Sequence, residues 1–259
     1  MGEVRRTIEL LWLPEPDETA EAGGRKRGRR PGLTVTRVVE AGIAMADAEG
    51  LDAVSMRRVA QELGVVPMTL YTYVPDKNAL LDLMLDRLYL AMPRAGRPDR
   101  PWRERLTAVA EENRRLYADH PWAASLPASR PPLGPGLMAK YEHELRAFDG
   151  CGLDDVERDS ALTFLIGFVQ SAARTEADVR SAATRSGATD YEWWSERGPI
   201  FEMVFDTHRY PTATRVGAAA GEALGAAYDP GHAYVFGLQR VLDGLAVLIE
   251  GRGAPGDSR

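Results

Sequence analysis

The sequence predicts an all-α protein in which a small N-terminal helix-turn-helix unit precedes a larger helical body. Apolar residues recur at helical spacing through most of the 259 residues. Between residues 33 and 90 the helical segments are short and are separated by glycine and proline at turn positions. No stretch alternates apolar and polar residues in a way that would form the strands of an α/β sheet.

The first three helices of the chain are expected between residues 35 and 73. The first runs from about Val35 to Ala48, with its apolar residues on one face. Ser55 can cap the second helix, and Gly64 supplies the left-handed residue that ends it. Pro67 occupies a first-turn position of the third helix, which ends near Tyr73. Three short helices with one small core form a helix-turn-helix unit, whose last helix normally enters the DNA major groove.

These residues resemble the TetR family of transcriptional regulators. The resemblance runs through AMADAEGLDAVSMRRVAQELGV from Ala44 and through LYTYVPDKNALL from Leu70. It implies a homodimer with an N-terminal three-helix helix-turn-helix DNA-binding domain and a C-terminal helical ligand-binding and dimerisation domain. Such a protein binds double-stranded operator DNA and regulates transcription, by default as a repressor that a small-molecule effector releases.

The resemblance also assigns roles in DNA binding to individual residues. The base-facing residues are expected to be Arg57, Pro67, Met68 and Thr69, and the phosphate-contacting residues Thr34, Thr69, Tyr71, Tyr73 and Lys77. Since Pro67 and Met68 offer few hydrogen bonds, the expected readout combines contact with thymine methyl groups and a bond from Arg57 to guanine. The alternatives are a core aromatic for Tyr71 and a solvated helix start for Lys77.

Charge is unevenly distributed along the chain. The net charge is −6, yet Arg25 to Arg30 holds basic residues and no acid. We expect residues 1–30 to form a flexible basic arm, followed by the DNA-binding domain at 31–76 and the ligand-binding domain at 77–259. The basic segment either engages DNA or is a solvated charge run, and Gly28 to Gly32 resembles the core of an AT-hook.

The body is expected to contain further helices. The segment from Lys77 to Met92 is apolar nearly all round, so it should be buried on several sides and link the two domains. The other helices are expected at 102–119, 137–148, 154–183, 190–207 and 229–250. The two long helices at 154–183 and 229–250 carry more apolar surface than one chain readily buries, which predicts a dimeric four-helix bundle. The last helix and His120-Pro121 resemble the tetracycline-repressor-like C-terminal domain.

An effector pocket is expected between the helices that begin at Lys77, Trp102 and Asp154. Its wall would be apolar with few polar groups, which suits a small hydrophobic or aromatic effector. The residues expected to line it are Leu88, Tyr117, His120, Trp122, Phe164 and Phe168. The alternative is that these side chains simply fill the core.

Several classes of protein are disfavoured by the sequence. No glycine-rich phosphate loop or nucleophile-elbow motif is present, and no Cys and His cluster has metal-site spacing, so we expect neither an enzyme nor a bound cofactor or metal. A single cysteine, Cys151, and the absence of an apolar run near the ~18 residues of a membrane helix indicate a cytoplasmic protein. Two alternatives to a ligand-responsive regulator stay open: a ligand-independent DNA-binding architectural protein, and a protein-interaction module that does not bind DNA.

Overall fold

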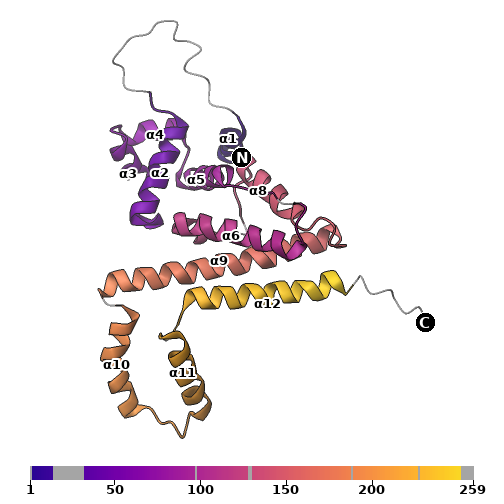
Figure 1. Ribbon diagram of the computed structural model, residues 1–259. Helices are drawn as coiled ribbons and strands as arrows, with labels where there is room; N and C mark the ends of the chain where they lie inside the picture. Colours follow the sequence, from indigo (N-terminus) through magenta and orange to yellow (C-terminus); the bar gives the residue numbers. More distant parts are fainter. Residues whose placement is uncertain are drawn as a thin grey trace, which may run out of the picture. The chain divides into compact units, whose positions relative to one another are not determined.

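The computed structural model describes residues 2–13, 32–96, 98–127, 130–187, 189–226 and 228–251. All regular structure in these ranges is helical, which confirms the predicted fold class (Figure 1). The chain has two compact units, Met1–Thr163 and Phe164–Arg259. The basic segment Arg25 to Arg30 and the AT-hook-like residues up to Pro31 lie outside the described residues.

The helix-turn-helix has the predicted elements: α2 (Val35–Glu49), α3 (Met56–Glu62) and α4 (Pro67–Tyr73). The Ser55 side chain accepts a hydrogen bond from the backbone N–H of Arg58 at 3.3 Å and so caps α3. Gly64 has a φ of +69°, the left-handed conformation that the turn after α3 requires. The core of this unit consists of fully buried apolar side chains: Val38, Val54, Val59, Ala60, Leu70 and Val74.

α5 (Lys77–Ala91) follows α4 and is buried on several sides, as its composition predicts. The Asp76 side chain caps it by accepting from the backbone N–H of Ala79 at 2.8 Å. α5 packs against α2 of the DNA-binding unit and against α8 (Pro135–Arg146) of the body. It therefore forms the expected mechanical link between the two parts of the first unit.

The remaining body helices of this unit are α6 (Trp102–Asp119), which matches its predicted bounds, and the four-residue α7 (Pro121–Ala124). α8 begins two residues earlier than expected because Pro135 occupies its first turn, where a missing N–H is tolerated. α7 was not predicted, since His120-Pro121 was interpreted only as the end of α6. Proline in fact starts this short helix as well.

A further helix, α1 (Gly2–Trp12), lies within the segment that was expected to be a flexible arm. It packs against α5, and the Trp12 indole Nε1–H donates to the carbonyl of Leu133 at 2.6 Å. The Arg6 guanidinium donates to the carbonyl of Thr72 in the last turn of α4. These contacts come from residues far along the chain, so the local charge pattern of residues 1–13 could not indicate them.

The second unit contains α9 (Asp155–Ser186) from Phe164 onward, α10 (Asp190–Val204), α11 (Pro211–Leu224) and α12 (Pro230–Glu250). Its part of α9 runs antiparallel to α12 (Figure 1), and the Phe168 ring lies against Gly237 and stacks on Tyr234 with ring centroids 5.8 Å apart. α11 was not predicted. Its apolar residues are mostly small alanines, although Pro211 starts it and Gly225, at a φ of +65°, ends it.

α12 is long and apolar enough to cross a membrane by length and composition. The sequence analysis found no apolar run of this length, because the charged residues Arg240 and Asp243, which form an ion pair, interrupt it. Buried core helices of soluble proteins have the same composition, and α12 has a buried face formed by Tyr234, Leu238, Val241, Leu242, Leu245 and Ile249. Packing accounts for this face, whereas Phe236 and Val247 of the same helix are exposed.

Candidate DNA interface and effector region

The recognition helix α4 presents an apolar face to solvent. Met68 is 73% exposed and the preceding Val66 is 66% exposed, whereas Leu70 is fully buried and anchors the helix to the core. Tyr71 is 41% exposed, so the core-aromatic alternative for this residue does not describe its position. Pro67 is also exposed and stands at the first helical position. The residues predicted to read thymine methyl groups therefore lie on an accessible surface.

The two adjacent arginines of α3 differ in their surroundings. Arg58 donates to a Glu49 carboxylate oxygen at 2.7 Å and to the carbonyl of Ala53 at 3.4 Å. Arg57 is exposed and has no hydrogen bond or ion pair within the described ranges of the chain. Arg58 thus holds α3 to the end of α2, while the Arg57 guanidinium is available for an external acceptor.

Two of the five predicted phosphate contacts stand at the N-terminal ends of helices. Thr34 caps α2, its hydroxyl accepting from the backbone N–H of Arg37 at 3.2 Å, and Lys77 is the first residue of α5. Thr69 and Tyr73 are half-buried within α4. N-terminal turns of helices carry free backbone N–H groups and a partial positive charge, both of which favour phosphate oxygens.

A polar junction joins the body to the DNA-binding unit. The same carboxylate oxygen of Asp47, in α2, lies 2.8 Å from Nδ1 of His120 and 2.7 Å from the indole Nε1 of Trp122. His120 follows α6 directly, and Trp122 belongs to α7. His120 and Trp122, which were both predicted to line an effector pocket, thus contact the same carboxylate. Asp47 itself was not predicted as a functional residue.

The other predicted pocket residues occupy different places. Leu88 and His120 line a small cavity of about 190 Å³, between the end of α5 and the last turns of α6. Tyr117 and Trp122 are buried in the core. Phe164, which is 57% exposed, and Phe168, which stacks on Tyr234, belong to the second unit.

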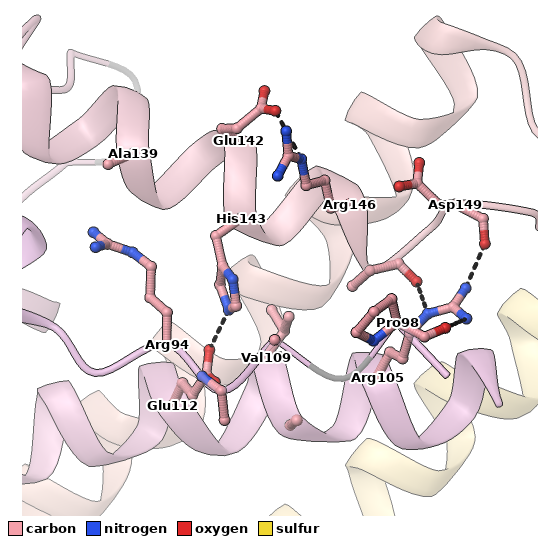
Figure 2. Close-up of a pocket in the computed structure, with 14 residues that line it drawn as sticks. Arg94, Pro98, Arg105, Val109, Glu112, Ala139, Glu142, His143, Arg146 and Asp149 are labelled. Atoms are coloured by element: carbon pink, nitrogen blue, oxygen red, sulfur yellow. Dashed lines mark hydrogen bonds and ion pairs between the residues drawn. The ribbon is translucent and has the colours of Figure 1, made fainter. Parts of the chain in front are cut away.

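A larger cavity, of about 720 Å³, lies between α6, α8 and the segment that follows α5 (Figure 2). Its polar lining residues are Arg94, Arg105, Glu112, Glu142, His143, Arg146 and Asp149, and alanine, valine, glycine and proline residues complete the wall. The sequence reasoning missed this cavity. A signal was present, because Arg105, Ala108, Val109 and Glu112 share one helical face and so do Ala139, Glu142, His143 and Arg146.

A buried polar network lies in the core of the first unit and ties α6 to α8. The Asn113 amide donates to Glu144 Oε1 at 2.6 Å, and Lys140 donates to Glu144 Oε2 at 2.8 Å. The Lys140 ammonium also lies 5.3 Å from the centre of the Tyr89 ring. Burial raises the pKa of the Tyr89 hydroxyl, and the nearby Glu144 and Asp86 carboxylates raise it further, so Tyr89 stays neutral.

Comparison with known proteins agrees with this architecture. Residues 38–84 match the family model described as "Bacterial regulatory proteins, tetR family", and residues 95–249 match "Tetracyclin repressor-like, C-terminal domain". The chain belongs to the TetR family. Among TetR-family relatives, the HTH-type transcriptional repressor DrrR1 of Streptomyces coeruleorubidus is 43% identical over 253 residues, covering 97% of this chain and 88% of that protein.

Two further proteins extend the comparison. An HTH-type transcriptional regulator of Saccharopolyspora erythraea is 31% identical over 167 residues, covering 62% of this chain and 70% of that protein. The crystal structure of ActR from Streptomyces coelicolor in complex with actinorhodin superposes with a TM-score of 0.69 at 27% identity, covering 85% of this chain and 98% of that chain. TetR-family proteins are ligand-responsive DNA-binding regulators of transcription, which confirms the predicted class of function.

Proposed function

We propose that this TetR-family protein is a cytoplasmic homodimeric repressor that binds an operator through α4 and leaves it when a small hydrophobic or aromatic effector binds the body. The observation that carries the DNA-binding part is the α4 surface, where Met68 and Tyr71 are exposed while Leu70 anchors the helix. A dimer presents two such helices to successive turns of the major groove.

Base reading is assigned to Arg57, Pro67, Met68 and Thr69. The exposed guanidinium of Arg57 can form two hydrogen bonds to guanine. The exposed apolar side chains of Met68 and Pro67 can contact thymine methyl groups. Thr34, Thr69, Tyr71, Tyr73 and Lys77 are assigned to phosphates. These contacts contribute sequence-independent, salt-sensitive affinity.

The Asp47 junction supports a route from effector to DNA. His120 and Trp122 contact Asp47 of α2, and α5 packs against both α2 and α8. An effector that binds more tightly to a body conformation in which α2 has shifted lowers DNA affinity by its differential binding to the two states, with a coupling of ~1–3 kcal/mol.

The effector class rests on the lining predicted from the sequence and on a relative. Within the first unit, Leu88 and His120 would provide part of the wall of the effector site, at the small cavity beside the end of α5. The ActR structure was determined in complex with actinorhodin, which supports a small-molecule effector for this chain.

Operator binding and release test the proposal. The dimer should bind DNA from the promoter next to its own gene, with affinity that falls steeply with salt, and an aromatic compound should release it in a fluorescence-anisotropy assay. Binding that no compound in an aromatic library alters would favour the architectural protein. The absence of salt-dependent binding to that promoter would favour the protein-interaction module.

A further inference from the structure

The larger cavity beside α6 has the size of a small-molecule site. Its volume of about 720 Å³ lies within the ~300–1,000 Å³ range of ligand pockets. Ala95, Ala108, Val109 and Ala139 contribute an apolar wall, and three arginines and three acidic residues also line the cavity. The cavity therefore suits a molecule with both an apolar skeleton and a charged group.

The acidic side chains of this cavity are already engaged. Glu112 accepts from the backbone N–H of Ala95 at 2.8 Å and lies 2.8 Å from Nε2 of His143. Glu142 pairs with Arg146 at 2.9 Å, and Asp149 pairs with Arg158 at 3.0 Å. The carboxylates of the lining thus have cationic or N–H partners of their own.

The guanidinium groups of Arg94 and Arg105, by contrast, are bonded to backbone carbonyls. Arg105 donates to the backbone carbonyls of Arg100 at 2.8 Å and Ala147 at 2.9 Å. Arg94 donates to the carbonyl of Tyr89, and its Nε is buried with no hydrogen-bond partner. Neither forms an ion pair with a carboxylate in the part of the chain that the structure describes, and Figure 2 shows no ion pair from Arg94 to the acids drawn. The positive charge of these two arginines is therefore compensated by backbone carbonyls and, for Arg105, the Cys151 sulfur, but by no carboxylate in the described residues.

We propose that this cavity binds an organic anion, a small molecule with a carboxylate, sulfonate or similar acidic group on an aromatic or aliphatic skeleton, and that Arg94 is the cation that pairs with the acidic group. A partly buried guanidinium without an anionic partner is costly, and a charge-assisted bond to a planar acid offsets that cost. Arg105 adds positive potential from the opposite end of the cavity, and the apolar wall accepts the skeleton.

The position of Arg94 also connects this site to the rest of the first unit. Arg94 lies just beyond the end of α5 and is bonded to Tyr89 in the last turn of that helix. Glu112 lines both this cavity and the small cavity that is also lined by Leu88 and His120. An anion that draws the Arg94 side chain toward it changes the bonding at the end of α5, which packs on α2. In this respect the inference rests on the proposed effector-responsive function and names the chemistry of the effector.

The test uses two fluorescent probes with the same aromatic skeleton, the anionic anilinonaphthalene sulfonate and the neutral phenylnaphthylamine, with the full-length protein. Arg94→Gln should weaken binding of the sulfonate by about tenfold or more and leave binding of the neutral probe within about twofold. Arg94→Lys keeps the charge but loses the planar fork, so its loss should be intermediate. Arg5→Gln, which removes the same charge from an exposed site on α1, should change neither affinity.

Unchanged sulfonate affinity in Arg94→Gln, or an equal loss for both probes, would overturn the anion site. If Arg94→Gln does not fold, Arg94→Lys decides: a selective loss of sulfonate binding supports the site, and no loss overturns it. Operator binding by the unliganded wild-type protein is measured in parallel. Failure there counts against the proposed function, whereas the probe result counts for or against the anion site.

Discussion

The backbone N–H of Gly136 donates to Oδ2 of Asp86 at 3.1 Å, so the first turn of α8 is capped by an acid from the middle of α5. The Leu137 N–H donates to Oδ1 of the same carboxylate at 2.8 Å. A Cβ atom at Gly136 would collide with the Asp86 carbonyl oxygen and would lie 2.9 Å from the Leu90 nitrogen. Close contact between α5 and α8 therefore requires glycine at this position.

Gly136→Ala should destabilise the protein by about 1–3 kcal/mol or more, because the atoms that a new Cβ meets are backbone atoms that cannot move aside. Urea denaturation followed by circular dichroism measures the change. Gly217→Ala is the matched control, since a Cβ at that helical position meets nothing within 4 Å, and it should stabilise α11 by about 0.5–1 kcal/mol. Equal stability of the two variants would contradict the close contact.

Asp86 should also contribute to the dependence of stability on pH. Burial raises the pKa of its carboxyl group, and the two backbone N–H groups only partly oppose this effect. The contribution to stability is fully present below the ordinary pKa of 3.8 and is lost as the pH rises through the higher pKa of the folded state.

Asp86→Asn, which stays neutral, tests this pH dependence. The stability of the wild type relative to the variant should fall between pH 3 and pH 7, as measured by denaturant titration at each pH. A relative stability that rises with pH over this interval would show instead that the N–H groups dominate.

Arg57→Ala should weaken operator binding by about 1–3 kcal/mol and relax the preference for guanine at one position of each half-site. Competition binding with a set of single-base operator variants measures both effects. Arg58→Ala is the neighbouring control, and because Arg58 is bonded to Glu49 its loss should leave the ranking of operator variants unchanged. An equal loss on every operator for Arg57→Ala would assign this residue to phosphate contact.

Tyr71→Phe and Lys77→Ala should each weaken binding by roughly 1 kcal/mol on the operator and on its variants alike, as expected for a lost phosphate hydrogen bond. Lys77→Ala should in addition reduce the slope of the binding constant against salt concentration by about one unit. Tyr71→Phe should not, because it removes no charge. Sequence-dependent losses in either variant would place that residue in the base-reading set.

The apolar surface left uncovered in the second unit predicts where two chains meet. Leu165 and Leu245 are already buried within one chain. A glutamate at either position would therefore disturb the folding of that chain and would not test its association with a second one. Phe236 and Val247 on α12 are exposed, Val247 by 77%, and they are better probes of association. Phe236→Glu and Val247→Glu should yield folded monomers in sedimentation and lose operator binding, whereas Val4→Glu on α1, a comparably exposed valine, should remain dimeric. Dimers in both α12 variants would place the interface elsewhere.

Local signals in the sequence determined the helix-turn-helix. Ser55, Gly64, Pro67 and Asp76 each act within four residues of their own position, through a cap, a left-handed turn or a fixed φ. The amphipathic pattern of α6 and α12 likewise identifies a buried face without reference to any partner. These features, together with the TetR-like motifs, were sufficient to predict the fold class and DNA binding from the residues alone.

Tertiary structure decided which side chains meet across the chain. The junction of Asp47 with His120 joins residues 73 positions apart, and the packing of Gly136 on Asp86 joins residues 50 apart. Tyr117 and Trp122 were predicted to line a pocket and lie in the core, while the charged cavity at Arg94 and His143 was not predicted. A helical pattern specifies the face that a residue occupies. Whether that face meets a side chain, a cavity or solvent depends on how the helices cross, and only the folded chain determines that.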